Sequence, residues 1–236
     1  MRQRRSAIAT EPSGALGPAS ELIEECPEVS RIALSGVVRE RAPWLALLAL
    51  DGRIGRMVLG SAEPLLGQMR LAWWRDQLGK TVAERPGGEP LLDLIGTSWA
   101  GREQALVALV DGWEALLSER PLSASDAMRL VEARTVAAGE LARLLNHPTA
   151  QVEAARAGAL WACADLAVHA QHESERAWAI EEGNARSGDP LSLPRGLRPL
   201  AVIGGLARRS LRRGGTPMLG DRLSPLAALR IGIIGR

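Results

Sequence analysis

The chain has 236 residues, of which 46% are hydrophobic and 24% charged, a composition typical of a globular rather than a disordered protein. Its longest uncharged runs, such as residues 42–50 and 199–207, are far shorter than the roughly 20 residues that span a bilayer. No apolar segment follows the first arginines, so we expect no signal peptide. Cys26 and Cys163 lack metal-ligand spacing, and we expect reduced thiols in a cytoplasmic protein.

The net charge of +2 is unevenly distributed along the chain. The segment from Arg195 to the last residue holds nine arginines and one acid, Asp221, so it carries +8. The first 194 residues therefore sum to −6. Such a basic tail, residues 195–236, is typical either of a solvated terminus or of a surface for nucleic acid or an anionic membrane.

In the first half of the chain, Ser20 opens a short acidic stretch that Pro27 interrupts. Apolar residues at helical spacing predict a helix over 44–59. Pro64 suits the first turn of a second helix, and Gly79 lies just past its expected end. Residues 85–90, RPGGEP, predict a loop. A further helix is expected from Ser98 through about residue 117, before Pro121.

In the second half, Ser123 with Asp126 resembles a capping box, which predicts a helix to Leu145 that Asn146 and Pro148 end. One long helix is expected over 149–182, another over 200–213 and a short one near 226–234. Strand signals are nearly absent, since no period-2 alternation of β-branched residues is sustained anywhere. We therefore predict an all-α bundle of six to eight helices.

Most catalytic motifs are missing from the sequence. There are three histidines and no tyrosine, and no Gly-x-Ser-x-Gly elbow or glycine-rich phosphate loop is present. The strongest polar pattern is Asp165, His169, His172 and Arg176, which would share one face of the expected 149–182 helix. Residues arranged in this way could serve as metal ligands, but a solvated helix face is the simpler interpretation. We therefore predict no metal site.

A second candidate set consists of four arginines on the two helices expected over 44–59 and 64–78. Guanidinium groups that face a common groove bind diphosphate in bidentate fashion, although arginine is so abundant here that surface positions are also expected. The four arginines are Arg53, Arg56, Arg70 and Arg75.

The segment 50–78, LDGRIGRMVLGSAEPLLGQMRLAWWRDQL, contains an unusual Trp-Trp-Arg-Asp run after a Glu-Pro turn. This segment resembles the squalene/phytoene synthase family, in particular a bacterial branch similar to a mitochondrial assembly factor for respiratory complex I. Residues 199–214 and 131–134 are similar to that branch more weakly. The residues that match are Glu63, Pro64, Leu66, Gly67, Arg70, Leu71, Trp73, Trp74, Arg75, Asp76 and Leu78.

The resemblance implies an isoprenoid-synthase-like helical bundle, here one domain over 1–236 with flexible segments at 1–20 and 183–198. Active members hold Mg²⁺ with two aspartate-rich motifs and so promote the departure of diphosphate. The first motif would fall at Gly55, Arg56 and Leu59, and none of these is acidic. The second would lie near residues 165–172, where only Asp165 remains. No two of the eight aspartates are closer than 15 positions in sequence.

We therefore favour a non-catalytic family member that binds prenyl lipid or acts as an assembly factor, with no catalytic residues and no cofactor. The second hypothesis is a prenyl-diphosphate transferase with an atypical Mg²⁺ site. The third is an adaptor for a membrane surface or nucleic acid; of these partners we expect an anionic inner-membrane surface and no nucleic acid. For prenyl diphosphate or prenyl lipid, the expected binding residues are Arg53, Arg56, Arg70, Asp165 and His169.

Overall fold

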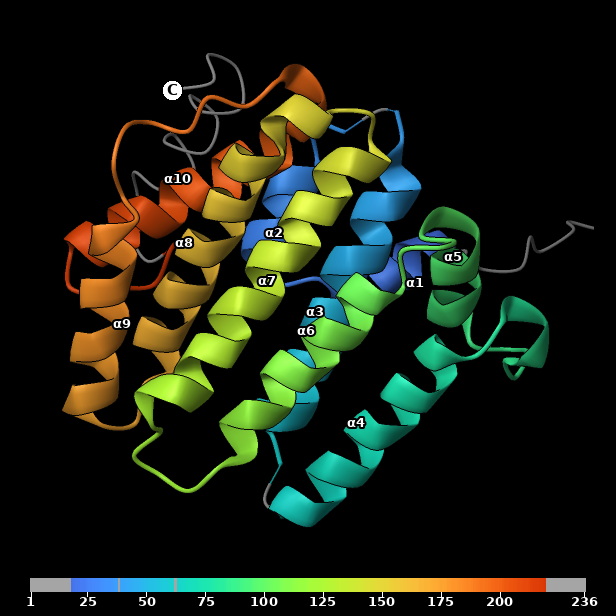
Figure 1. Ribbon diagram of the computed structural model, residues 1–236, viewed down its shortest axis with the longest axis horizontal. Helices are drawn as coiled ribbons and strands as arrows, with labels where there is room; N and C mark the ends of the chain where they lie inside the picture. The colour runs from blue at the N-terminus through green and yellow to red at the C-terminus, as the bar shows by residue number, and fades with distance from the viewer. Residues whose placement is uncertain (1–17, 38, 62, 220–236) are drawn as a thin grey trace, which may run out of the picture.

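The computed structural model describes residues 18–37, 39–61 and 63–219, which form ten α-helices and no β-strand (Figure 1). The predicted all-α class is confirmed, but the described residues alone exceed the six to eight helices expected. The α-helices are α1 (Pro18–Glu25), α2 (Glu28–Leu34), α3 (Arg41–Leu59), α4 (Pro64–Gly79), α5 (Pro90–Ser98), α6 (Gln104–Glu114), α7 (Ala124–Leu144), α8 (Gln151–His169), α9 (Glu173–Ala185) and α10 (Arg198–Arg212). Short 3₁₀ turns are η1 (Val82–Glu84), η2 (Ala115–Leu117), η3 (Pro148–Ala150) and η4 (Arg195–Leu197).

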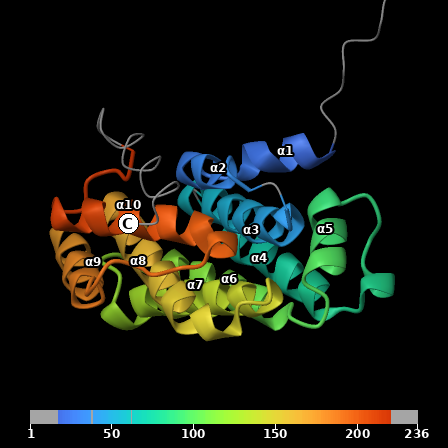
Figure 2. The same cartoon turned by 90° about the horizontal axis from the view of Figure 1, so that it is seen from above.

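Helix α3 is the central element of the structure. Every residue from 44 to 52 is buried, including Asp51, because α3 packs against α1, α2, α4, α5, α6 and α7. A helix that is apolar on nearly all sides can be stable only when neighbours cover each side. Figure 2 shows α1 and α2 on the side of α3 that faces away from α6 and α7.

Helix α4 begins and ends almost as the sequence predicts, with Pro64 at its first position. Its inner face packs on α6 and α3. A side chain at Gly67 would come within 3.0 Å of Leu117, so α4 approaches η2 closely there. Its outer face is also apolar, since Leu65, Met69 and Trp73 are 67%, 63% and 41% exposed.

Helices α6, α7 and α8 lie side by side, and α10 crosses α8 (Figures 1 and 2). Small residues permit the close contacts. A Cβ atom at Gly112 would clash with Ala133, and one at Gly158 would lie 2.8 Å from the Cβ of Ala138 and closer still to the carbonyl oxygen of Arg134. This packing sets the distance between α7 and α8, the two helices that supply Arg134 and Asp165.

Two of the expected helices are wrong in extent. Ser98 ends α5 rather than starting a helix, and the chain turns through Gly101, at φ +77°, before α6 begins. The helix expected over 149–182 is broken, because Ala170 is extended with ψ 131° and α9 starts afresh after His172. The carboxylate of Glu175 accepts a hydrogen bond from the backbone N–H of Gln171 and stabilises this break.

The last described helix buries its apolar face. Leu200, Ile203 and Leu206 are fully buried, and α10 packs on α8, α2 and α9. In the segment expected to be flexible, residues 183–185 complete α9, and Leu191 and Leu197 are buried. The helix expected near 226–234 and most of the segment 1–20 lie outside the described residues.

The contact at Gly158 predicts a strong effect of a single methyl group. Gly158→Ala should destabilise the protein by about 1–3 kcal/mol, because neither backbone can move away without repacking α7 on α8. Gly139→Ala is the matched control on α7, since its Cβ would meet its nearest neighbour at an ordinary 3.4 Å. It should be neutral or gain up to about 1 kcal/mol of helix propensity. Urea denaturation of both variants measures the difference, and equal stabilities would contradict it.

Candidate functional site

A buried cluster of charges joins α3, α7 and α8. Asp51 lies within the apolar interior of α3, where an unpaired carboxylate would be costly. Its Oδ1 accepts hydrogen bonds from the Nε1 of Trp113 and the Nε of Arg134, both at 2.9 Å. Its Oδ2 accepts one from the Nη2 of Arg134 at 2.8 Å. The bidentate contact with Arg134 thus offsets part of the cost of removing Asp51 from water.

Arg134 is the centre of this cluster and is only 2% exposed. Its Nη2 also donates to the Oδ2 of Asp165 at 2.9 Å. The guanidinium lies over the rings of Trp161 and Trp113, at 4.0 and 5.0 Å from the centroids, where aromatic faces favour a cation. Its Nη1 is buried without a partner among the described residues. Arg134, on α7, therefore links Asp51 on α3 with Asp165 on α8.

The titration behaviour of the cluster follows from this geometry. Burial raises the pKa of Asp51, and the charge of Arg134 opposes that rise. For Asp165, burial also acts upward, but the charge of Arg134 and the hydrogen bond from His169 outweigh it and lower the pKa to about 2. The hydrogen bond with Asp165 raises the pKa of His169, against a smaller opposing effect of burial.

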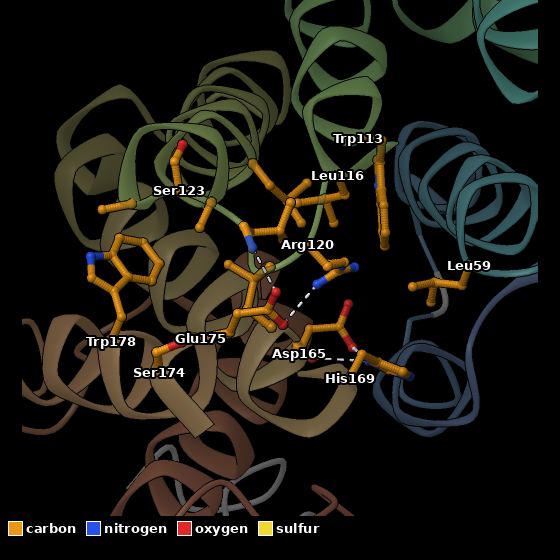
Figure 3. Close-up of a pocket in the computed structure, with 15 residues that line it drawn as sticks. Leu59, Trp113, Leu116, Arg120, Ser123, Asp165, His169, Ser174, Glu175 and Trp178 are labelled. Carbon is orange, nitrogen blue, oxygen red and sulfur yellow. Dashed lines mark hydrogen bonds and ion pairs between the residues drawn. The ribbon is translucent and has the colours of Figure 1, made fainter. Parts of the chain in front are cut away.

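Next to this cluster lies a pocket of about 220 Å³ (Figure 3). Its walls come from the ends of α3, α6 and α8, from η2, from the starts of α7 and α9 and from the loop before α7. Most of the lining is apolar, and two tryptophan rings contribute to it. The lining residues used below are Trp113, Arg120, Asp165, His169, Glu175 and Trp178.

A second polar group closes one side of the pocket. The carboxylate of Glu175 accepts hydrogen bonds from Arg120 Nη1 at 2.8 Å, from Leu122 N–H at 2.7 Å and from Gln171 N–H at 3.0 Å. Burial acts to raise the pKa of Glu175, but these donors lower it on balance. Glu175 therefore remains ionised and fixes the loop before α7 to the start of α9.

The structure places the predicted site residues in different parts of the molecule. Asp165 and His169 line the pocket from one face of α8, and the Nδ1 of His169 lies 3.4 Å from the Oδ1 of Asp165. The solvated face favoured for Asp165 is wrong, because its side chain is only 18% exposed and binds Arg134. His172 and Arg176 follow the break after α8 and do not continue that face.

The four candidate arginines do not meet in one groove. Arg53 binds Glu25 and Glu89 and lies 5.3 Å from the ring centroid of Trp74. Arg56 also binds Glu25, so both arginines fasten α1 to α3. Arg75 pairs with Asp111 and Glu114 of α6, and Arg70 is exposed on α4. None of the four lines the pocket; a substrate-binding role for Arg53, Arg56 and Arg70 stays a prediction.

The residues around the pocket do not fit the magnesium cluster of an active transferase. Asp51 and Asp165 face each other, but the guanidinium of Arg134 occupies the position between their carboxylates. Among the described residues, no group of three or more His, Cys, Asp or Glu side chains is arranged to hold a metal ion. In the same residues, no helix combines the length and the apolar content needed to cross a bilayer.

The two cysteines offer no nucleophile to the site. Burial raises the pKa of Cys26 to about 12 and that of Cys163 to about 11, so both thiols stay protonated at neutral pH.

Sequence reasoning missed Asp51, Arg134 and Glu175. A signal existed for Asp51, which is the single charge in the apolar run 42–52 and must therefore find a buried partner. Nothing in the sequence around Arg134 distinguishes it from the other 27 arginines. The pairing of Asp51 with Arg134 was therefore not predictable from the local sequence pattern alone.

Comparison with protein-family models, with curated proteins and with solved structures gave no match to this chain. The pocket and the charge cluster are therefore the features from which a function can be inferred.

Removing Arg134 should leave two carboxylates without a cation in the interior. We expect Arg134→Leu to destabilise the protein by about 3–5 kcal/mol in urea denaturation at neutral pH. The matched control is Arg143→Leu, which removes a half-exposed arginine from the same helix, where it pairs with Glu140. That change should cost less than about 1 kcal/mol. Similar losses in the two variants would contradict the central role of Arg134.

The pair of Asp165 and His169 predicts a stability difference that depends on pH. Because the pKa of His169 is raised, its contribution is complete below the ordinary histidine value of about 6.5 and is lost as pH rises through the higher folded value. Because the pKa of Asp165 is lowered to about 2, its own contribution is lost only as pH falls from about 4 towards 2.

Wild type should therefore exceed His169→Gln in stability between about pH 4 and 6 and lose this advantage at alkaline pH. His169 is about half exposed, so we expect only about 0.2–1 kcal/mol, reduced in about 1 M salt. Urea denaturation across this pH range measures the effect. A difference independent of pH would refute an ionic contribution of His169.

Proposed function

We propose that this chain is a non-catalytic member of the squalene/phytoene synthase family, with an isoprenoid-synthase-like bundle, that binds a prenyl lipid in the pocket beside Asp165. The observation that carries the proposal is Arg134 between Asp51 and Asp165, with an apolar pocket next to it. An internal guanidinium neutralises carboxylates permanently, whereas catalysis of diphosphate departure needs free cations at the leaving group. The site thus keeps an apolar cavity without the charge that turnover requires.

Pocket shape and lining support a lipid ligand. Pockets for small molecules are mostly apolar with a few polar groups that orient the ligand, which describes this cavity well. Trp113 and Trp178 present rings, and Leu59, Leu116 and Leu166 present aliphatic side chains. At about 220 Å³ the cavity is smaller than the roughly 300–1,000 Å³ that holds a drug-sized ligand. A cavity of this volume suits part of a prenyl chain rather than a whole one.

A second candidate function is electrostatic docking of α10 on an anionic membrane surface. The apolar face of α10 is buried in the protein, and on its outer face Arg212 is exposed and Arg208 is partly exposed. Burial lowers the pKa of Arg208, and the charges of Arg212 and Arg156 lower it further, as expected where cations gather. Salt-sensitive co-sedimentation with anionic vesicles tests this function. A cytoplasmic protein at the inner-membrane surface would combine both proposals.

The proposed function predicts binding without turnover. Incubation with farnesyl or geranylgeranyl diphosphate and Mg²⁺ should yield no hydrocarbon product, and sustained formation of one would overturn the proposal. Farnesol should quench tryptophan fluorescence, because two of the seven tryptophans line the pocket.

Blocking the pocket should weaken this binding. Ala127→Phe fills it from α7 and Ser174→Trp narrows it from α9, and we expect a loss of about tenfold or more in affinity from either. Ala72→Phe, at an exposed position on α4, is the matched control and should bind as wild type does. Circular dichroism verifies the fold of each variant. Unchanged affinity in both pocket variants would place the ligand elsewhere.

A further inference from the structure

Two carboxylates line the pocket, and N–H groups of the chain already occupy the first of them, that of Glu175. Its Oε2 accepts hydrogen bonds from Arg120 Nη1 and from the backbone N–H of Gln171. Its Oε1 accepts one from the backbone N–H of Leu122, and the side chain is only 6% exposed. Glu175 therefore offers little to a ligand that would donate a hydrogen bond.

The second carboxylate, that of Asp165, is held on both sides by groups of the chain. Its Oδ2 accepts a hydrogen bond from Arg134 Nη2 at 2.9 Å, and the Nδ1 of His169 lies 3.4 Å from its Oδ1. That Nδ1 also lies 2.9 Å from the backbone oxygen of Asp165, which can only accept a hydrogen bond, so the Nδ1 proton points back into α8. Each carboxylate of the lining thus already has a cationic or ionisable partner within the fold.

Arg120 differs from both carboxylates, because it keeps hydrogen-bonding groups that the fold does not use. It is the one arginine in the pocket lining, and of its nitrogens only Nη1 donates to another described residue. A guanidinium carries five N–H donors, so those on Nε and Nη2 remain. Figure 3 shows that the end of the guanidinium that does not contact Glu175 points towards the space between Trp113 and Asp165. The pocket therefore presents unused donors at one defined place.

The charges around the pocket do not favour an anionic head group. Arg120 is paired with Glu175 at 2.8 Å. Arg134 is paired with Asp51 and Asp165. A diphosphate would therefore enter a mostly apolar pocket without an unpaired arginine in its lining, and the loss of water around its charges would be costly. An uncharged carbonyl oxygen loses far less hydration, and it can accept from Nε or Nη2 of Arg120 without separating Arg120 from Glu175.

We infer that the head group of the lipid is an uncharged hydrogen-bond acceptor, a carbonyl group such as that of an ester, ketone or quinone, which binds the unused N–H groups of Arg120 while the apolar chain fills the rest of the pocket. This inference rests on the proposed function, in which the pocket binds a prenyl lipid. Glu175 holds the guanidinium and is itself fixed by two backbone N–H groups, so the donors are oriented before a ligand enters. Such preorganisation reduces the entropy cost of binding.

The test compares three probes built on a ten-carbon prenyl skeleton: methyl geranate, which offers a carbonyl group, myrcene, which has no polar group, and geranyl diphosphate, which is anionic. Quenching of tryptophan fluorescence in the wild-type protein should give methyl geranate the lowest dissociation constant, at least about tenfold below those of the other two probes. Diphosphate or hydrocarbon binding as tight as that of the ester, or tighter, would overturn this inference and leave lipid binding intact. Absence of binding by all three would overturn the proposed function and the inference with it.

Two variants assign the preference to Arg120. Arg120→Met keeps an aliphatic side chain at the pocket but removes the guanidinium, so it should reduce the ester-to-hydrocarbon affinity ratio by about tenfold, with little change for the hydrocarbon. Arg102→Met is the matched control, since Arg102 pairs with Glu140 outside the pocket lining, and it should keep the wild-type ratio. An unchanged ratio in folded Arg120→Met would refute the assignment. If that variant does not fold, the probe series on wild type still decides between carbonyl, hydrocarbon and anion.

Discussion

Arg134 lies where α3, α7 and α8 meet, and the arrangement of the bundle depends on how its charge is shared. Each of its two carboxylate partners comes from a different helix, and one guanidinium nitrogen contacts both. Removing either partner, or the arginine, would leave an uncompensated charge in the interior. The cluster therefore fixes the axial positions of three helices relative to one another, which apolar packing alone would permit to slide. The pocket forms at the end of the bundle that this alignment defines.

The segment that resembles the squalene/phytoene synthases has a clear structural role. Trp74 is buried and lies beneath the guanidinium of Arg53, Arg75 pairs with two acids of α6, and Gly67 permits close approach to Leu117. These residues fasten α4 to α3, α6 and η2, whereas the first part of the same segment supplies Asp51 to the charge cluster and Leu59 to the pocket. A sequence run of this kind can therefore persist as packing, whatever chemistry the pocket performs.

The sequence predicted the elements that are determined locally. Pro64 starts α4, Ser123 caps α7 with a hydrogen bond to the backbone N–H of Asp126, and Asn146 with φ 60° follows the end of α7. The break between α8 and α9 could not be predicted in this way, because no Pro or Gly marks it and a distant loop stabilises it through Glu175.

The candidate site was predictable only in part for the same reason. Asp165 and His169 are four positions apart on one helix, so their association follows from helical geometry. The partners of Asp165 come from α7 and, through Arg134, from α3, which are 31 and 114 positions away along the chain. Many arginines compete for such a role in a chain with 28 of them, so only the tertiary structure identifies Arg134.

The charge cluster links stability to the nature of the ligand. A metal-dependent transferase leaves its acidic groups unpaired until metal ions arrive, and it tolerates their repulsion for the sake of chemistry. Here the neutralising charge is covalently part of the chain, so Asp51 and Asp165 are paired without any bound ion. One arginine serves two aspartates, and His169 lies 3.4 Å from the other oxygen of Asp165. Both oxygens of Asp165 thus face a cationic or ionisable group of the chain, Arg134 on one side and His169 on the other, so the polar side of the pocket is arranged by the fold itself.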